Sequence, residues 1–158
     1  MRAVPLTTCL LLWAVTLHGQ STYGQTTSNH KAPTLSWGPA PAVFPQGAKM
    51  AVVDGDPGKA APFTVELAFP DGYRIPPHFH PTDETVEVKK GTFLVGMGDT
   101  LDVAKTKVMK VGAKGQVPAN HHHYAVARGA TVVSVTSMGP FAMTYVNPAD
   151  DPQSTAHP

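Results

Sequence analysis

Side chains that commonly bind metals gather in one stretch of this 158-residue chain. His78 and His80 are separated by a single residue, and Glu84 follows four positions later. On a strand, successive side chains alternate faces and each residue advances about 3.3 Å, so the two imidazoles would point the same way about 6.6 Å apart. Glu84 heads a run in which apolar and polar residues alternate, so its carboxylate would begin a buried face and need a partner. These residue types and spacings predict a binding site for one metal ion.

A second stretch supplies a further ligand. It holds three consecutive histidines, His121, His122 and His123, after a turn marked by Pro118 and Asn120. His123 directly precedes a strand-like run, whereas His122 would be the ligand if the loop were shifted. The remaining histidines could assist proton transfer beside the metal, or could be exposed imidazoles at the rim of a pocket.

The first stretch resembles the cupin superfamily. The family motif G-x5-H-x-H-x3-E-x6-G is matched at every fixed position from Gly72 to Gly91. The resemblance extends over roughly residues 48 to 146 and implies an all-β fold, a jelly-roll barrel of the double-stranded β-helix type with the metal inside it.

The second stretch resembles the second cupin motif, G-x5-P-x-G-x2-H-x3-N, with two departures. Gly112, Pro118 and His123 match, whereas Asn120 replaces glycine and Ala127 replaces asparagine. Asparagine is the non-glycine residue that best tolerates a positive φ, so we expect the turn to survive the first change. The second change removes only a local hydrogen bond. The motif spacing selects His123 as the ligand.

The resemblance thus implies a metal set of His78, His80, Glu84 and His123. Imidazole and carboxylate ligands suit one divalent transition metal, which could be Mn, Fe, Ni, Cu or Zn. Four protein ligands on a six-coordinate ion leave two positions open, as in catalytic rather than structural sites. No catalytic residue beyond the metal set can be assigned, because Glu87 lies on the opposite strand face from Glu84.

Two classes of function are compatible with such a site. One is a metal-dependent enzyme acting on a small oxygen-rich or carbonyl compound, for which the resemblance implies dioxygenase, decarboxylase or isomerase chemistry. The other is a non-catalytic module that binds or senses a small molecule or the metal itself. The same fold can serve both.

The elements that must position these residues are short strands. Residues that favour strands alternate with Gly, Pro and Asp, which predicts a sandwich or barrel. Aromatic and thioether side chains near the chain end and in the middle strands are expected to line the pocket: Phe93, Met97, Phe141, Met143 and Tyr145. The expected strands are 50–53, 63–69, 84–89, 92–97, 107–111, 123–128, 131–137 and 141–146.

Four segments are expected along the chain. Residues 1–24 have the pattern of a secretory signal peptide, with cleavage after Ser21 or Gly24, which predicts a periplasmic or secreted protein. Residues 25–47 form a proline-rich arm, 48–147 the cupin barrel, and 148–158 a C-terminal tail. The arm is expected to pack along the domain or a partner subunit, although a disordered linker is an open alternative.

Composition limits the partners. The leader holds one of the 12 Lys and Arg residues, none of the 11 Asp and Glu residues, and the single cysteine, Cys9. The mature chain is therefore neutral and thiol-free, which excludes disulfide scaffolds and argues against nucleic acid as a partner. No membrane partner is expected after leader cleavage. Trp37 and Phe44 in the arm would leave apolar surface in water, which predicts a homodimer.

Overall fold

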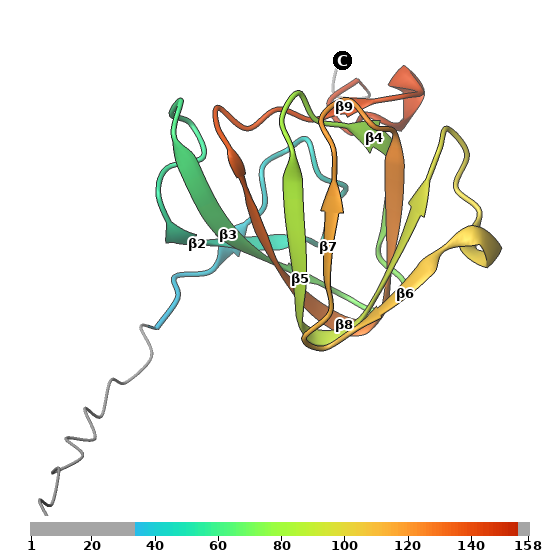
Figure 1. The fold of residues 1–158 in the computed structure, drawn as a ribbon, viewed down its shortest axis with the longest axis horizontal. Helices are drawn as coiled ribbons and strands as arrows, with labels where there is room; N and C mark the ends of the chain where they lie inside the picture. Colours follow the sequence, from blue (N-terminus) through green and yellow to red (C-terminus); the bar gives the residue numbers. More distant parts are fainter. Residues whose placement is uncertain (1–33, 155–158) are drawn as a thin grey trace, which may run out of the picture. The chain divides into compact units, whose positions relative to one another are not determined.

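Two long, bent strands, β5 (Glu84–Met97) and β8 (His123–Met138), lie at the centre of the fold (Figure 1). They pair antiparallel along nearly their whole length, from Glu84 opposite Ser137 to Met97 opposite His123. On its other side, β8 pairs with β3 (Pro62–Phe69) through its second half and with β4 (Arg74–Phe79) through its first half. One strand thus connects the sheet segments that carry the predicted metal ligands.

The computed structural model describes residues 34–154, in which a nine-stranded antiparallel sheet curls into a barrel (Figure 1). The predicted signal peptide and the first part of the arm lie outside these residues. None of the helices among the described residues is long and apolar enough to cross a membrane. The other elements are β1 (Gly38–Pro39), β2 (Lys49–Asp54), β6 (Lys107–Lys110), β7 (Lys114–Val117), β9 (Thr144–Tyr145) and the short 3-10 helices η1 (Val103–Lys105) and η2 (Pro148–Asp150).

The expected pairs of strands 84–89 and 92–97, and 123–128 and 131–137, are single strands in the structure. Strand β5 bends at Gly91, which has a φ of 76°. A Cβ atom at Gly91 would lie 2.6 Å from the carbonyl oxygen of Ala130, so only glycine fits where the two strands approach each other. The bends let both strands pass around the barrel without ending.

Three strands were not among those expected, and one was expected to be longer. Strand β4 contains Pro76 and Pro77, which lack N–H donors and disfavour a strand assignment. The structure accommodates them with a register shift between Ile75 and His78, and the Pro77 carbonyl still accepts from the Val146 amide at 2.9 Å. Strands β1 and β7 are short, and the expected strand 141–146 is reduced to the two residues of β9.

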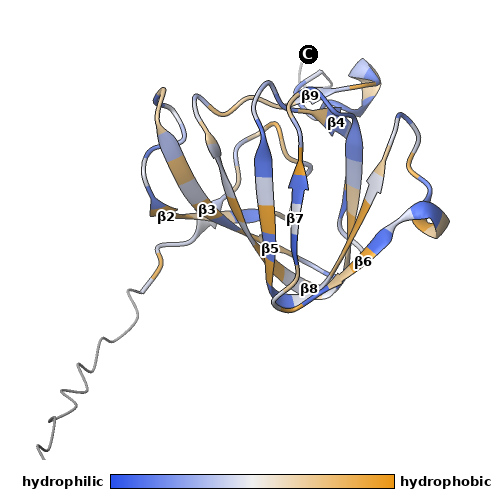
Figure 2. Cartoon of the chain, viewed as in Figure 1, coloured by the Kyte–Doolittle hydropathy of each residue, from blue (hydrophilic) through white to orange (hydrophobic). Residues whose placement is uncertain are grey.

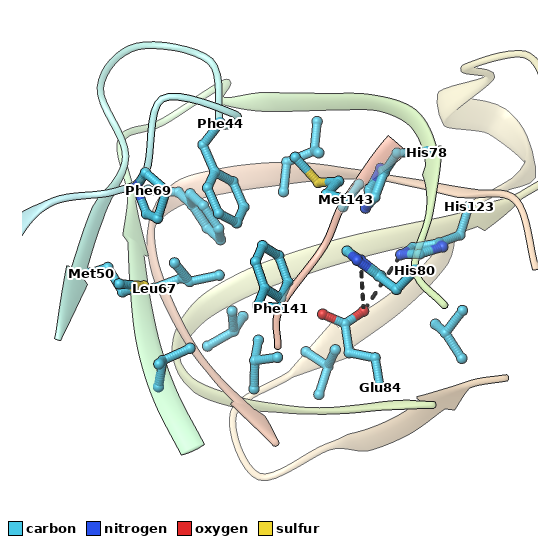
Figure 3. Close-up of a pocket in the computed structure, with 18 of the residues that line it drawn as sticks. Phe44, Met50, Leu67, Phe69, His78, His80, Glu84, His123, Phe141 and Met143 are labelled. Atoms are coloured by element: carbon cyan, nitrogen blue, oxygen red, sulfur yellow. Dashed lines mark ion pairs between the residues drawn. The ribbon is translucent and has the colours of Figure 1, made fainter. Parts of the chain in front are cut away.

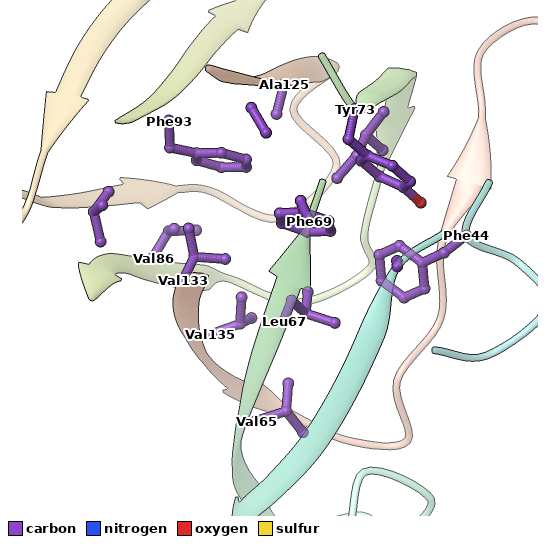
Figure 4. Packing of buried hydrophobic residues seen from close by; sticks show 14 of the residues in the cluster. Phe44, Val65, Leu67, Phe69, Tyr73, Val86, Phe93, Ala125, Val133 and Val135 are labelled. Carbon is purple, nitrogen blue, oxygen red and sulfur yellow. The ribbon is translucent and has the colours of Figure 1, made fainter. Parts of the chain in front are cut away.

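The core occupies the barrel interior, and apolar residues recur in bands along the long strands (Figure 2). In β3, every second residue faces the core, since Phe63, Val65, Leu67 and Phe69 are all buried. Phe69 stacks on Phe93 of β5 at a ring-centroid distance of 5.7 Å (Figure 4). Burying these side chains stabilises the fold by about 1.5–3 kcal/mol each.

At the far end of β5, burial departs from the strict alternation of a strand. Met97 is 53% exposed, whereas Leu94, which alternation places on the outer face, is 1% exposed. The outer face is covered here because the fully buried Tyr124 packs close to Gly96 and donates its hydroxyl to the Asp102 carbonyl at 3.0 Å. The segment that holds η1 therefore covers part of the outer face of β5, which sequence alternation predicts to face solvent.

The described part of the arm packs on the barrel of its own chain. Phe44 is 8% exposed, and the carbonyls on either side of it are held by two tyrosines. The Tyr145 hydroxyl donates to Val43 at 2.7 Å, and the Tyr73 hydroxyl donates to Pro45 at 2.5 Å. Burial raises the pKa of both phenols, so both remain protonated donors at neutral pH. This double attachment directs the Phe44 ring towards the core (Figure 4).

Candidate metal centre

The four predicted ligands come from three neighbouring strands (Figure 3). His78 lies on β4, His80 follows directly after that strand, Glu84 begins β5 and His123 begins β8. His78 pairs with His123 in the sheet register, so β4 and β8 bring the two motifs together. The three histidines are buried, and the Glu84 side chain is 12% exposed.

The three imidazoles converge. Each of His78, His80 and His123 offers one ring nitrogen, and these atoms all lie within 4.8 Å of one another. Glu84 does not belong to this mutually close group, but its Oε2 lies 3.4 Å from the Nε2 of His123 and 3.8 Å from that of His80 (Figure 3). The structure thus brings together all four predicted residues, with three histidines at the centre and the carboxylate to one side.

The hydrogen bonds fix which nitrogen of each ring faces the site. The Nδ1 atoms of His78, His80 and His123 lie 2.7, 2.8 and 2.9 Å from the backbone carbonyls of Pro76, Ala142 and His121, respectively. A carbonyl oxygen can only accept, so each Nδ1 carries a proton. In the neutral ring, Nε2 then has a free lone pair. Lone pairs of three imidazoles and one carboxylate facing one another form a set that fits a divalent transition metal.

Electrostatics keep two members of the set, His78 and Glu84, in their ligand form. Burial is the main cause that lowers the pKa of His78 to about 3, and repulsion from His123 and His80 adds to it, so the His78 ring is neutral at pH 7. Burial alone would raise the pKa of Glu84, but the three neighbouring imidazoles, that of His123 foremost, outweigh it. The net direction is downward, and Glu84 is ionised.

The loop before β8 is anchored to the first motif. Asn120 has a φ of 61°, as the sequence predicts for a residue that replaces glycine in this turn. Its amide donates to the His80 carbonyl at 2.7 Å, and the Ala119 amide donates to Asp83 Oδ1 at 2.8 Å. These two bonds set the position from which His123 enters the site.

The other two histidines of this loop lie outside the cluster. His121 is exposed, and His122 is half-buried with its Nδ1 2.6 Å from Asp99 Oδ1 and its ring 5.1 Å from that of Phe79. Neither lines the cavity beside the metal set. The position of His122 argues against a register in which it replaces His123.

A cavity of about 70 Å³ opens beside the cluster into the barrel. Of the side chains expected to line it, Phe93, Phe141 and Met143 do so, whereas Met97 and Tyr145 do not. Met97 points to solvent, and Tyr145 uses its hydroxyl to hold the arm. Phe44 of the arm also lines the cavity, which no sequence pattern indicates. Phe44 lies parallel to Phe141, with a centroid distance of 6.0 Å.

No family model matches the sequence, and a search of curated proteins finds no significant match. Solved structures do match. A polyketide cyclase, RemF, from Streptomyces resistomycificus is 18% identical over 68% of this chain and 76% of that chain, with a TM-score of 0.57. A cupin 2 domain-containing protein from Halorhodospira halophila is 15% identical over 66% and 73%, with a TM-score of 0.55. An oxalate oxidase in complex with glycolate is 23% identical over 68% and 59%, with a TM-score of 0.52.

These identities are low, so the likeness is one of architecture. It agrees with the two motifs and with the curled antiparallel sheet described above. The chain therefore has the cupin fold.

Proposed function

We propose that His78, His80, His123 and Glu84 bind one divalent transition metal and that this ion is the centre of the protein's activity. The observation that supports it best is that all three Nδ1 atoms donate to backbone carbonyls. Without a cation, three lone pairs and a carboxylate would face one another in a buried site. A bound metal would supply Lewis acidity, stabilising negative charge on a substrate oxygen.

The reaction is proposed to be that of an enzyme acting on a small oxygen-rich or carbonyl compound, by dioxygenation, decarboxylation or isomerisation. The structural neighbours include an oxalate oxidase, a dimethylsulfoniopropionate lyase (DMSP lyase) and a polyketide cyclase. Because one fold hosts such different activities, it does not select among them. The role of this chain's own residues is to orient the imidazoles, hold Glu84 ionised and keep bulk water out of the cavity.

The metal proposal can be tested by elemental analysis of the parent protein and of two matched variants. The parent is expected to carry one equivalent after reconstitution with Mn, Fe, Ni, Cu or Zn, and His80→Ala to carry much less. His121→Ala should match the parent, because His121 is exposed and outside the cluster. A parent that takes up none of the five metals, or a His80→Ala variant that keeps a full equivalent, would contradict the proposal.

One observation favours the alternative of a non-catalytic binding module. Among the residues that line the cavity, the polar ones are the four of the metal set, so no further side chain is placed to move a proton. Proton NMR of carbonyl and carboxylate compounds incubated with the metal-loaded protein distinguishes the two functions. Chemical conversion of a compound supports the enzyme, whereas binding without conversion supports the module.

A further inference from the structure

The cavity beside the metal set is lined almost entirely by hydrocarbon. Apart from His78, His80, His123 and Glu84, every lining side chain is aliphatic, aromatic, proline or methionine. The nearby tyrosine hydroxyls, of Tyr73 and Tyr145, are used by the arm and do not reach the cavity. A ligand hydroxyl placed away from the metal set would therefore lose its hydrogen bonds to water without replacement. This lining disfavours an oxygen-rich ligand such as a sugar.

The polar end of the cavity has a defined charge. In the metal-loaded protein, the imidazoles that bind through Nε2 are neutral and Glu84 contributes one negative charge. A divalent ion then leaves a net charge of +1, which complements a monoanion such as a carboxylate. The charge thus specifies the polar group of the ligand, its head, and the apolar lining specifies the remainder of the ligand, its body.

The size and shape of the body follow from the cavity. A volume of about 70 Å³ accommodates on the order of five water molecules, which is roughly the scale of one aromatic ring. Phe141 lies beside the metal set with its ring 5.3 Å from that of His80 (Figure 3). The Phe44 ring lies nearly parallel to it, at an interplanar angle of 6°. Flat aromatic walls of this kind favour a flat apolar ligand.

From these observations we propose that the ligand is a small monocarboxylate with an aromatic or compact hydrocarbon body, its carboxylate at the metal and its body against Phe141. The inference rests on the proposed metal site and narrows its substrate class. It narrows the oxygen-rich or carbonyl compounds of the proposed function to monocarboxylates and excludes polyols such as sugars.

Calorimetric titration with three monoanions tests this directly. Benzoate carries the head and the body, acetate the head alone, and gluconate a polyol body. Each buried methylene strengthens binding roughly fourfold, so benzoate is expected to bind the metal-loaded protein at least tenfold more tightly than acetate or gluconate. Elemental analysis of the same sample reports metal content independently.

Substitutions locate the body of the ligand. Phe141→Ser should reduce the benzoate-to-acetate affinity ratio at least fivefold, whereas Val108→Ser, on the exposed face of β6, should leave the ratio at its parental value. Met143→Gln, which keeps side-chain size, provides a second lining variant if Phe141→Ser does not fold.

Each outcome has a distinct meaning. A metal-loaded protein that binds benzoate no better than acetate, or that prefers gluconate, overturns this inference and leaves the metal site standing. Parental ratios in folded Phe141→Ser and Met143→Gln variants overturn the placement of the body. A protein that carries no metal overturns the proposed function, and this inference with it.

Discussion

The imidazole of His80 donates its Nδ1–H to the backbone carbonyl of Ala142, at 2.8 Å and across 62 positions of the chain. The residue before Ala142 is Phe141, whose amide donates to the Pro57 carbonyl at 2.7 Å and whose ring packs beside His80. One short loop therefore orients a metal-binding ring and supplies a wall of the cavity. Because the acceptor is a backbone atom, the loop's path rather than the side chain at position 142 sets the ring orientation.

Glu84→Gln is expected to lower metal affinity at least tenfold, because it keeps the size of the side chain and removes its charge. A chelator-competition titration measures the change. Glu87→Gln is the matched control, since Glu87 lies on the same strand but pairs with Lys89 and Lys114 at 3.1 and 3.3 Å. Equal affinities for the two variants would show that the Glu84 carboxylate is not a ligand.

The metal-free protein is expected to lose stability as the pH falls below about 6.5. The pKa of His78 is about 3 in the folded protein, against the ordinary value of 6.5 for an exposed histidine, so between these values the unfolded chain binds more protons. The loss should be about 1 kcal/mol for each pH unit in this window, and below pH 4.5 the lowered pKa of Glu84 acts in the same direction. Urea unfolding at a series of pH values measures it.

His121→Ala should show the same pH dependence, because His121 is exposed and lies outside the cluster. A free energy of unfolding that stays constant from about pH 6.5 to about pH 4.5 would contradict the assignment of His78 as a buried neutral imidazole.

Removing the arm's attachments should destabilise the barrel. Tyr145→Phe leaves the Val43 carbonyl without its donor and should cost about 1 kcal/mol. Phe44→Ala should cost about 3 kcal/mol, because the ring is buried. Urea unfolding of the metal-free variants measures both changes, and Trp37→Ala, whose side chain is 40% exposed, should cost less than about 1 kcal/mol. Losses for Phe44→Ala no larger than those for Trp37→Ala would mean that the arm contributes nothing to the core.

We expect the protein to be a homodimer in solution. Phe44 no longer supports this expectation, because it is buried in its own chain, but Trp37 remains exposed together with Val52, Val53 and Met138. Light scattering at micromolar concentration should give twice the chain mass. A mass equal to one chain would mean that these exposed residues do not form a dimer interface.

The exported form is expected to begin after Ser21 or Gly24. The apolar run that follows Arg2 and the small residues that end it are the basis of this prediction. Intact-mass measurement on protein recovered from the periplasm or medium of a bacterial host gives the answer. A mass that still includes residues 1–17 would contradict it.

The clustering of the three histidines and Glu84 could be predicted because the signal is local. Two histidines at a spacing of two share a strand face, and Asn120 supplies the positive φ that its turn needs. The orientation of His80 by Ala142 and the entry of Phe44 into the cavity could not be predicted in this way. Both depend on contacts between distant segments, and no sequence periodicity marks either of them.

Strand β4 and the outer face of β5 show why parts of the fold could not be predicted from the sequence. Pro76 and Pro77 argue against a strand by their chemistry, yet the barrel retains one by shifting its register. Alternation predicts that Leu94 faces solvent, yet it is buried, as is Tyr124, whose hydroxyl bonds to the Asp102 carbonyl. In both cases tertiary packing overrides a local preference.

The turn between β6 and β7 is a suitable place to attach a label. Most of the metal set lies near the starts of β5 and β8. Val117 of β7 pairs with Glu84, whereas Lys114, which begins β7, pairs with Glu87 and lies about 10 Å further along the strand. Val111, before that turn, is widely exposed. Since the only cysteine of the sequence, Cys9, lies in the predicted leader, a single thiol introduced at position 111 of the leaderless protein would carry a fluorophore, or a linker to a sensor surface, away from the metal end. The site would then stay accessible in the binding experiments described above.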